Sequence, residues 1–157
     1  MVTILYPTRG GNVTHRNQDW TFALAKERQA RLILLYVSNV HFLDHMLTPI
    51  SIDRVWEEMD ELGDFLLTMA QDRADQVGVT AEKIIRHGRF REAVKAVIEE
   101  EKVSVVVLGR PTQDTAITTA EYIQEVGEYL AAETEVEVFV IHEGEVVVTH
   151  LQRPPDP

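Results

Sequence analysis

The chain has 157 residues, of which 45% are hydrophobic and 26% charged, and this composition predicts a single globular domain. With no cysteine, it can form no disulfide, thiol nucleophile or cysteine-ligated metal site. A formal net charge of -11 disfavours nucleic acid and membrane lipid as partners, and no apolar run approaches the roughly 20 residues that span a bilayer. We expect a cytoplasmic protein with one domain over residues 1–152 and a disordered, proline-rich tail over residues 153–157.

Two apolar runs separated by a helical segment begin the chain. Val2–Tyr6 is rich in β-branched and aromatic residues, and Leu32–Val37 is apolar without alternation, which is typical of a strand covered on both faces. The segment from about Thr14 to Ala30 contains good helix formers, with apolar positions at helical spacing. These three segments predict one βαβ unit with parallel strands.

A long amphipathic helix is predicted after Pro49, with Ser51 as its N-cap and Asp53 in its first turn. Apolar residues then recur at three- and four-residue intervals and predict one buried stripe. The stripe consists of Ile52, Val55, Trp56, Met59, Leu62, Leu66, Met69, Ala70 and Val77, with Arg73 at the same spacing. The acidic residues between them are expected to face solvent.

The second half of the chain continues to alternate strands with helices. Strands are predicted over Thr80–Arg86, Val103–Leu108, Val136–Ile141 and Val146–Leu151, and helices over Phe90–Glu101 and Thr119–Ala132. Thr118, Thr119, Ala120 and Glu121 match a capping box at the start of the last helix. This alternation predicts an open α/β sheet with helices on both faces.

Negative charge is concentrated in the last third of the chain. Between Pro111 and Gln152 there is no lysine or arginine, whereas nine residues are acidic. We interpret this region as a solvated acidic surface that favours solubility, rather than as a cation-binding surface.

The motifs that carry common chemistries are absent. The sequence contains no GxxxxGK[ST], GxGxxG, GxSxG or HExxH pattern and no EF-hand loop. His41, Asp44 and His45 could approach one metal ion, but two histidines and one carboxylate are better explained as a polar loop before Pro49. We therefore predict no catalytic residue and no metal site.

A candidate ligand site remains where strands end. The first strand leads into Arg9, Gly10 and Gly11, and the Val103–Leu108 strand leads into Gly109–Thr112. If these strands are neighbours, Arg9 and Arg110 converge, and the glycine amides can bind an anion at the start of a helix. The alternative is an ordinary strand-to-helix turn with two solvated arginines.

The chain resembles the universal stress protein family over nearly its whole length. The similarity lies in the order and spacing of four pieces: the opening strand with its glycine turn, Ala23–Val37, His87–Val94 and Val103–Gly109. The resemblance implies a five-stranded parallel sheet in the order 3-2-1-4-5, which makes the first and fourth strands neighbours. The chain then continues into a C-terminal antiparallel strand.

The family's ATP-binding motif is largely missing. ATP-binding members carry an Asp at the end of strand one, and after strand four a GxxG, nine residues and then Gly-Ser or Gly-Thr. Here Thr8 stands near the Asp position, Gly109 matches the first glycine, Thr112 replaces the second, and Tyr122 and Ile123 replace the last pair. The resemblance therefore points to the branch that does not bind ATP tightly, because Tyr122 cannot allow the close backbone approach that glycine does.

From this combination we predict a binding or regulatory module of a stress response, without turnover or cofactor. The alternative is a nucleotide-binding stress protein that holds ATP or AMP and hydrolyses it slowly. The candidate ligand-binding residues are Thr8, Arg9, Gly10, Gly11, Val37, Gly109, Arg110 and Thr112.

The last strand also predicts a homodimer through the C-terminal edge strands. Val146–Leu151 is too apolar for a free tail, and the preceding strand would otherwise expose an unpaired edge. The segment can fold back antiparallel within its own chain or pair with the partner's edge strand, and the resemblance makes a two-fold assembly the expectation in both cases.

Overall fold

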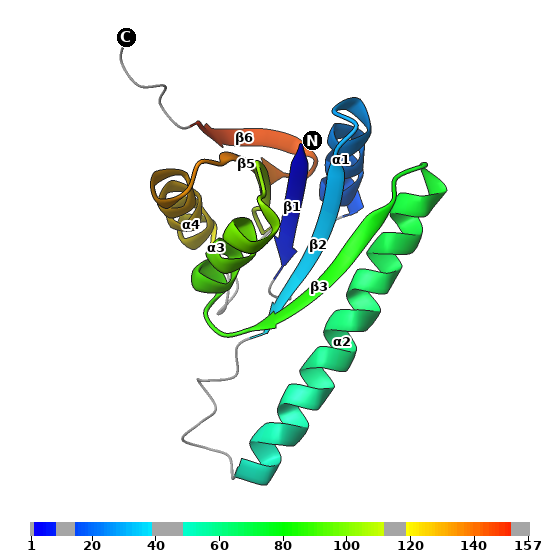
Figure 1. The fold of residues 1–157 in the computed structure, drawn as a ribbon, viewed down its shortest axis with the longest axis vertical. Coiled ribbons are helices and arrows are strands. Elements are labelled where there is room, and N and C mark those ends of the chain that lie inside the picture. Colours follow the sequence, from blue (N-terminus) through cyan, green and yellow to red (C-terminus); the bar gives the residue numbers. More distant parts are fainter. Residues whose placement is uncertain (1, 9–14, 39–48, 112–118, 152–157) are drawn as a thin grey trace.

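The computed structural model describes residues 2–8, 15–38, 49–111 and 119–151. Within these residues six strands form one sheet in the order β3-β2-β1-β4-β5-β6 (Figure 1). The strands are β1 (Thr3–Thr8), β2 (Arg31–Ser38), β3 (Ala81–His87), β4 (Val105–Gly109), β5 (Glu137–His142) and β6 (Glu145–His150). No helix in the described part of the chain is long and apolar enough to cross a membrane.

The pairing of the strands confirms the predicted topology. β1 lies parallel to both β2 and β4, and β3 and β5 extend the parallel sheet on its two sides. β6 pairs antiparallel with β5 of the same chain after a turn at Glu143 and Gly144, with a register shift at Val140 and Ile141. Of the two arrangements open for the last strand, the fold within its own chain is the one observed.

Four helices among the described residues cover the sheet on both faces (Figure 1). They are α1 (His15–Glu27), α2 (Pro49–Gln76), α3 (Phe90–Glu101) and α4 (Ala120–Glu133). Strand residues such as Leu35 and Val106 pack with α3 and α4, whereas Tyr36 and Val107 pack with α1 and α2. This alternation follows from the two-residue period of a strand and explains why the central strands are apolar throughout.

The buried face of α2 differs from the predicted stripe. Leu62, Met69 and Val77, which were expected inside, are 47%, 47% and 46% exposed, while Gly63 and Ala74 are buried. Small residues face the sheet here because the helix lies close to it: a Cβ on Gly63 would lie only 2.5 Å from the Tyr36 ring.

The predicted starts of α2 and α4 also differ from the observed ones. α2 already begins at Pro49, so Ser51 lies within the helix and the prediction of its N-cap is wrong. At α4 the N-cap is Thr119, whose hydroxyl oxygen accepts a hydrogen bond of 3.0 Å from the backbone N–H of Tyr122. The cap therefore comes one residue later than the Thr118 start of the matched capping box, as is common for helix boundaries read from sequence.

Candidate functional site

The strand order reverses between β1 and β4. β1 is followed by α1 on one face of the sheet, and β4 is followed by α4 on the other, while Ile4 and Val105 are register partners. At such a point the two connections diverge and leave a crevice beyond the carboxyl ends of the strands, which is where open α/β sheets bind ligands. The predicted neighbourhood of the first and fourth strands is confirmed.

The structure describes half of the predicted ligand-binding residues. Thr8 ends β1, Gly109 ends β4, Arg110 follows it, and Val37 lies one residue before the end of β2 with 1% of its surface exposed. All four are at the carboxyl edge of the sheet. The other predicted residues, Arg9, Gly10, Gly11 and Thr112, lie outside the described residues, as does the metal hypothesis at His41, Asp44 and His45.

Gly109 is closely surrounded by polar atoms. A Cβ at this position would lie 3.2 Å from the side-chain nitrogen of Asn17 and 3.5 Å from the hydroxyl oxygen of Tyr6. Burial raises the pKa of the Tyr6 hydroxyl far above its usual value, so this group stays neutral at any physiological pH. Both side chains can offer hydrogen bonds, but neither brings a charge to the crevice.

Asn17 is a residue that the sequence reasoning missed. Its side chain is 2% exposed, and its Oδ1 accepts a hydrogen bond of 2.8 Å from the backbone N–H of Gly144 in the β5–β6 turn. Its backbone carbonyl accepts another from the Thr21 hydroxyl, also at 2.8 Å. Asn17 therefore links the start of α1 to the opposite side of the crevice. Its spacing from Thr21 and Leu24, both on the buried face of α1, was the available signal.

Arg110 lies beside α4 and β6. Its backbone N–H donates a hydrogen bond of 2.7 Å to the carbonyl of Ile141. Its exposed side chain lines a pocket of about 210 Å³. Glu121 and Gln124 of α4 line the same pocket, together with valines of β5 and β6. A carboxylate in the same pocket offsets part of the charge that Arg110 would offer to an anion.

Side chains of the first turn of α4 pack in or against the core. The half-buried Tyr122 lies beside Phe90, with the two ring centroids 6.4 Å apart, and Ile123 is 3% exposed within the core on the α3 and α4 face. The Thr119 hydroxyl already occupies one of the amides at this helix end. The first turn of α4 thus carries two bulky side chains that pack in or against the core and one amide that is already hydrogen-bonded.

No group of three or more histidine, aspartate or glutamate side chains within the described residues could hold a metal ion. A smaller cluster does form between β3 and α2. The Nε2 atom of His87 lies 2.6 Å from an Asp60 carboxylate oxygen, and its ring stacks on Trp56 with centroids 4.2 Å apart. This cluster joins α2 to the carboxyl end of β3.

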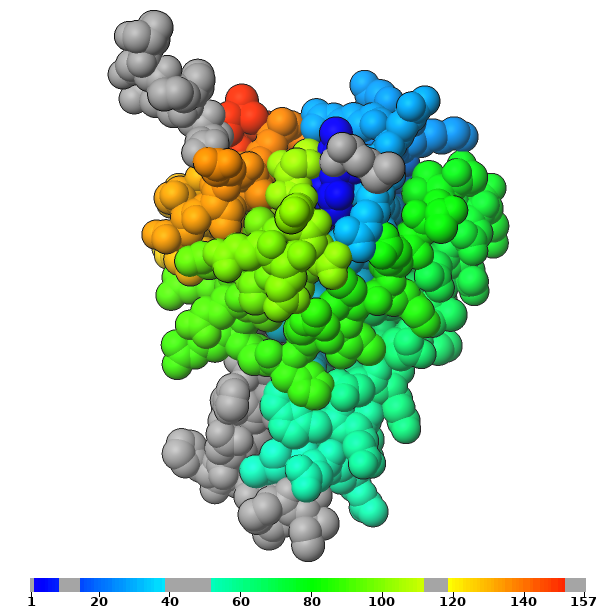
Figure 2. Space-filling model, viewed as in Figure 1, coloured from blue at the N-terminus to red at the C-terminus, as the bar shows by residue number. Residues whose placement is uncertain are grey.

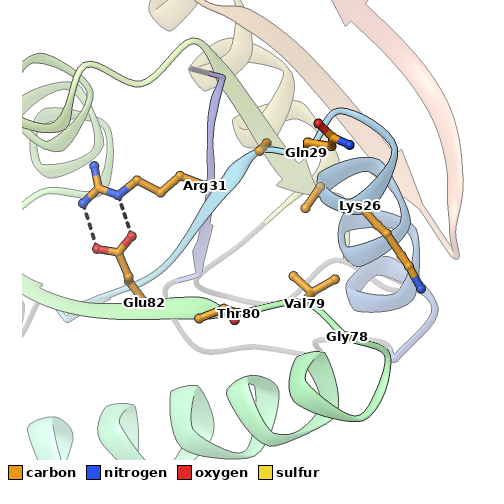
Figure 3. A pocket seen from close by; sticks show the side chains of 9 residues that line it. Lys26, Gln29, Arg31, Gly78, Val79, Thr80 and Glu82 are labelled. Atoms are coloured by element: carbon orange, nitrogen blue, oxygen red, sulfur yellow. Dashed lines mark hydrogen bonds and ion pairs between the residues drawn. The ribbon is translucent and has the colours of Figure 1, made fainter.

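A larger pocket of about 560 Å³ lies at the amino ends of β2 and β3, opposite the crevice (Figure 3). The guanidinium of Arg31 donates to both carboxylate oxygens of Glu82, which Figure 3 shows as two dashed lines, and to Glu101. This hydrogen bonding lowers the pKa of Glu82 and raises that of Arg31. Lys26 donates to the carbonyl of Val77. Both cationic side chains that line this pocket, Lys26 and Arg31, thus form hydrogen bonds within the protein.

Comparisons with known proteins agree with this architecture. The model of the universal stress protein family matches residues 1–142. A comparison with curated proteins gave no significant match. Among solved structures, the chain is similar to universal stress protein UspA from Lactobacillus plantarum, with a TM-score of 0.70, 17% identity, and coverage of 89% of this chain and 97% of that chain.

Two further similar structures are complexes with nucleotides. One is a universal stress protein in complex with cAMP, with a TM-score of 0.57, 18% identity and coverage of 90% and 97% of the two chains. The other is a universal stress protein family protein from Arabidopsis thaliana with AMP bound, with a TM-score of 0.62, 13% identity and coverage of 90% and 92%. At these sequence identities, the similarity shows only that the two proteins share the fold of this chain.

Proposed function

Because the chain belongs to the universal stress protein family, we propose that it acts as a binding or regulatory module of a stress response that does not hold ATP tightly. The observation that carries this proposal is the packing of Tyr122 and Ile123 at the start of α4. By the family resemblance, these two residues stand at the place of the Gly-Ser or Gly-Thr pair of ATP-binding members. Three consecutive phosphates need backbone amides that a ligand can approach closely, and a side chain as large as that of Tyr122 restricts this approach where glycine would not.

Electrostatics supports the same proposal. Arg110 shares its pocket with Glu121, and the whole chain carries a net charge of -11. A triphosphate brings about four negative charges at neutral pH, so its approach to this surface is opposed more strongly than that of a ligand with a single phosphate.

A nucleoside monophosphate is the second candidate ligand. The structures solved with AMP and with cAMP show that proteins of this fold accept nucleotides with one phosphate. In this chain Thr8 ends β1 and Gly109 ends β4 at the crevice, and Arg110, which follows Gly109, carries one guanidinium. One guanidinium can form a bidentate pair with a single phosphate, and slow hydrolysis of a bound nucleotide belongs to this second candidate.

Titration calorimetry with ATP, ADP and AMP separates these candidates. We expect no ATP binding in the micromolar range, because about 8 kcal/mol of binding free energy requires an organised phosphate site. Any AMP binding should weaken about tenfold or more in Arg110→Ala, which removes a charge-assisted hydrogen bond. Arg54→Ala removes an exposed charge from α2 and should leave the titration unchanged.

The proposal of weak ATP binding fails if the wild-type protein binds ATP with micromolar affinity and Arg110→Ala abolishes that binding. Equal weakening by Arg110→Ala and Arg54→Ala would instead mean that only the overall charge matters, and would reject the crevice as the AMP site.

The protein is also expected to form a homodimer through its C-terminal edge. β6 is the outermost strand on this side of the sheet, and Val146 and Val147 are 43% and 41% exposed. An edge strand with exposed valines offers both unpaired backbone groups and apolar surface to a second copy. Glu143 and Glu145 oppose close approach, but exposed charges are screened at physiological salt.

Sedimentation equilibrium at micromolar concentration tests the dimer. We expect the mass of two chains for the wild type and of one chain for Val147→Lys, because a lysine on the edge strand disfavours pairing. Ending the chain after Glu143 removes β6 and should also lower the dimer affinity. A monomeric wild type, or a dimer that both variants leave intact, would reject this role of β6.

A further inference from the structure

The outward face of α2 carries an apolar patch that the fold does not cover. Leu62, Phe65 and Met69 are 47%, 60% and 47% exposed, and their intervals of three and four residues place them along one line of the helix. The opposite side of α2 packs on the sheet through Gly63 and Ala70. Three large exposed side chains in one row are unusual for a surface helix and mark an interaction site.

Acidic residues extend this row at both ends. Glu58 precedes Leu62 by four residues and Asp72 follows Met69 by three, so the intervals along the row are four, three, four and three. These alternating intervals are those of the contact line between two coiled helices. Both acids are exposed and form no ion pair within the described part of the chain. We call these five residues, Glu58, Leu62, Phe65, Met69 and Asp72, the α2 row.

The location of α2 leaves the row accessible. α2 contacts β2, β3 and α1, and it runs along the margin of the molecule, with its first turns extending past the carboxyl end of β3 (Figure 1). In the space-filling view, the turquoise-to-green atoms of this helix form one border of the molecule (Figure 2). The row runs over fifteen residues from Glu58 to Asp72, which is about 21 Å of helix and matches the length of a short partner helix.

The geometry points to a basic amphipathic helix of another protein as the occupant of the α2 row. Such a helix would place apolar side chains against Leu62, Phe65 and Met69, and a lysine or arginine at each end against Glu58 and Asp72. Glu61, which is exposed on the same side of α2, adds a third negative charge beside the row. Apolar burial then supplies affinity, and the charges at the two ends select basic partners.

A second copy of this chain is a poorer occupant. If two α2 rows met in antiparallel orientation, Glu58 of each would face Asp72 of the other, and in parallel orientation each acid would face its own copy. Both arrangements bring like charges together at the two ends, which costs binding energy. The row is also remote from β6, because β3 and β6 are the opposite edges of the sheet.

The test uses three synthetic peptides of about four helical turns, measured by fluorescence anisotropy with the full chain. One has leucines at alternating three- and four-residue intervals in a lysine background. The second has the same leucines in a glutamate background, and the third has the composition of the first in scrambled order. We expect binding of the leucine–lysine peptide only, at micromolar affinity, and at least tenfold weaker binding to Phe65→Ser.

A charge reversal makes the test specific. The double variant Glu58→Lys and Asp72→Lys should lose the leucine–lysine peptide and gain the leucine–glutamate peptide. The matched control, Glu99→Lys with Glu125→Lys, changes the net charge equally at exposed positions of α3 and α4 and should behave as the wild type.

Three outcomes would overturn the proposal. An equal loss of affinity for the leucine–lysine peptide in the control variant would mean that the peptide is attracted nonspecifically to an acidic protein. Unchanged binding by Phe65→Ser would exclude the apolar row. A change in the mass of the protein itself with Phe65→Ser, measured without peptide, would show that a second copy covers the row. The intact circular dichroism spectrum of each variant checks that it folds.

Discussion

Gly63→Ala is expected to lower the free energy of unfolding by about 2 kcal/mol, although alanine favours a helix by about 1 kcal/mol over glycine. The added Cβ would lie 2.5, 2.8 and 2.9 Å from three atoms of the Tyr36 ring. Tyr36 is fully buried in the sheet beneath α2, so its ring cannot turn aside, and the helix must move instead. Urea unfolding followed by circular dichroism measures the change.

Gly127→Ala in α4 is the matched control. Its Cβ would also approach a side chain closely, at 2.9 Å, but the neighbour is the ring of His150 on the edge strand, which can turn toward solvent. We expect this variant to be as stable as the wild type or up to about 1 kcal/mol more stable.

A double-mutant cycle tests whether the loss of stability in Gly63→Ala comes from contact with the Tyr36 ring. In a Tyr36→Leu background the ring is gone, so Gly63→Ala should cost at least 1 kcal/mol less than in the wild type. If Gly63→Ala is stabilising by itself, or if its cost does not depend on Tyr36, the close packing of α2 on the sheet is not as described.

Asn17→Leu is expected to lower the free energy of unfolding by about 2 kcal/mol. Leucine keeps the branching and the number of heavy atoms of the asparagine side chain, but it leaves a backbone donor without its acceptor. The donor is the N–H of Gly144, which lies 2.8 Å from the Asn17 Oδ1 atom. A buried or half-buried N–H without a partner costs more than the net value of the bond itself, since it has also lost water.

The site-specific measurement for Asn17 is the hydrogen exchange of the Gly144 amide by NMR. Exchange should become faster in Asn17→Leu than the global loss of stability explains. Gln124→Leu is the control, because its hydrogen bond to Glu128 is exposed, and it should change stability by no more than about 0.5 kcal/mol. Unchanged protection of Gly144 would contradict the assigned link between α1 and the β5–β6 turn.

Much of the fold could be predicted because its apolar pattern has one clear period in each element. The Phe90–Glu101 helix has the predicted bounds, since its buried face consists of Phe90 and the regularly spaced Ala93, Val94, Val97 and Ile98. The pattern was ambiguous at α2, where apolar residues cover about half of the circumference. There the small residues Gly63 and Ala74 decide the buried face, because they allow the helix to approach the sheet.

The candidate site could be predicted only in part. The ends of β1 and β4 follow from the strand pattern, and their adjacency follows from the family resemblance, so Thr8 and Gly109 could be placed. The burial of Asn17 is signalled by its helical spacing, but its contact with Gly144 is not, because Gly144 is 127 positions away in the sequence. A polar side chain in a helix looks solvated until the tertiary fold places a distant backbone donor beside it.

We propose that the crevice between β1 and β4 does not retain ATP. This proposal is tested most directly by the nucleotide content of protein purified without added ligand, released by denaturation and identified by chromatography with mass spectrometry. We expect far less than one ATP per chain, and we expect any retained nucleotide to be a monophosphate. Close to one ATP per chain would contradict this expectation, because a nucleotide that survives purification requires an organised phosphate site. Tyr122 at the start of α4 and Glu121 beside Arg110 disfavour such a site.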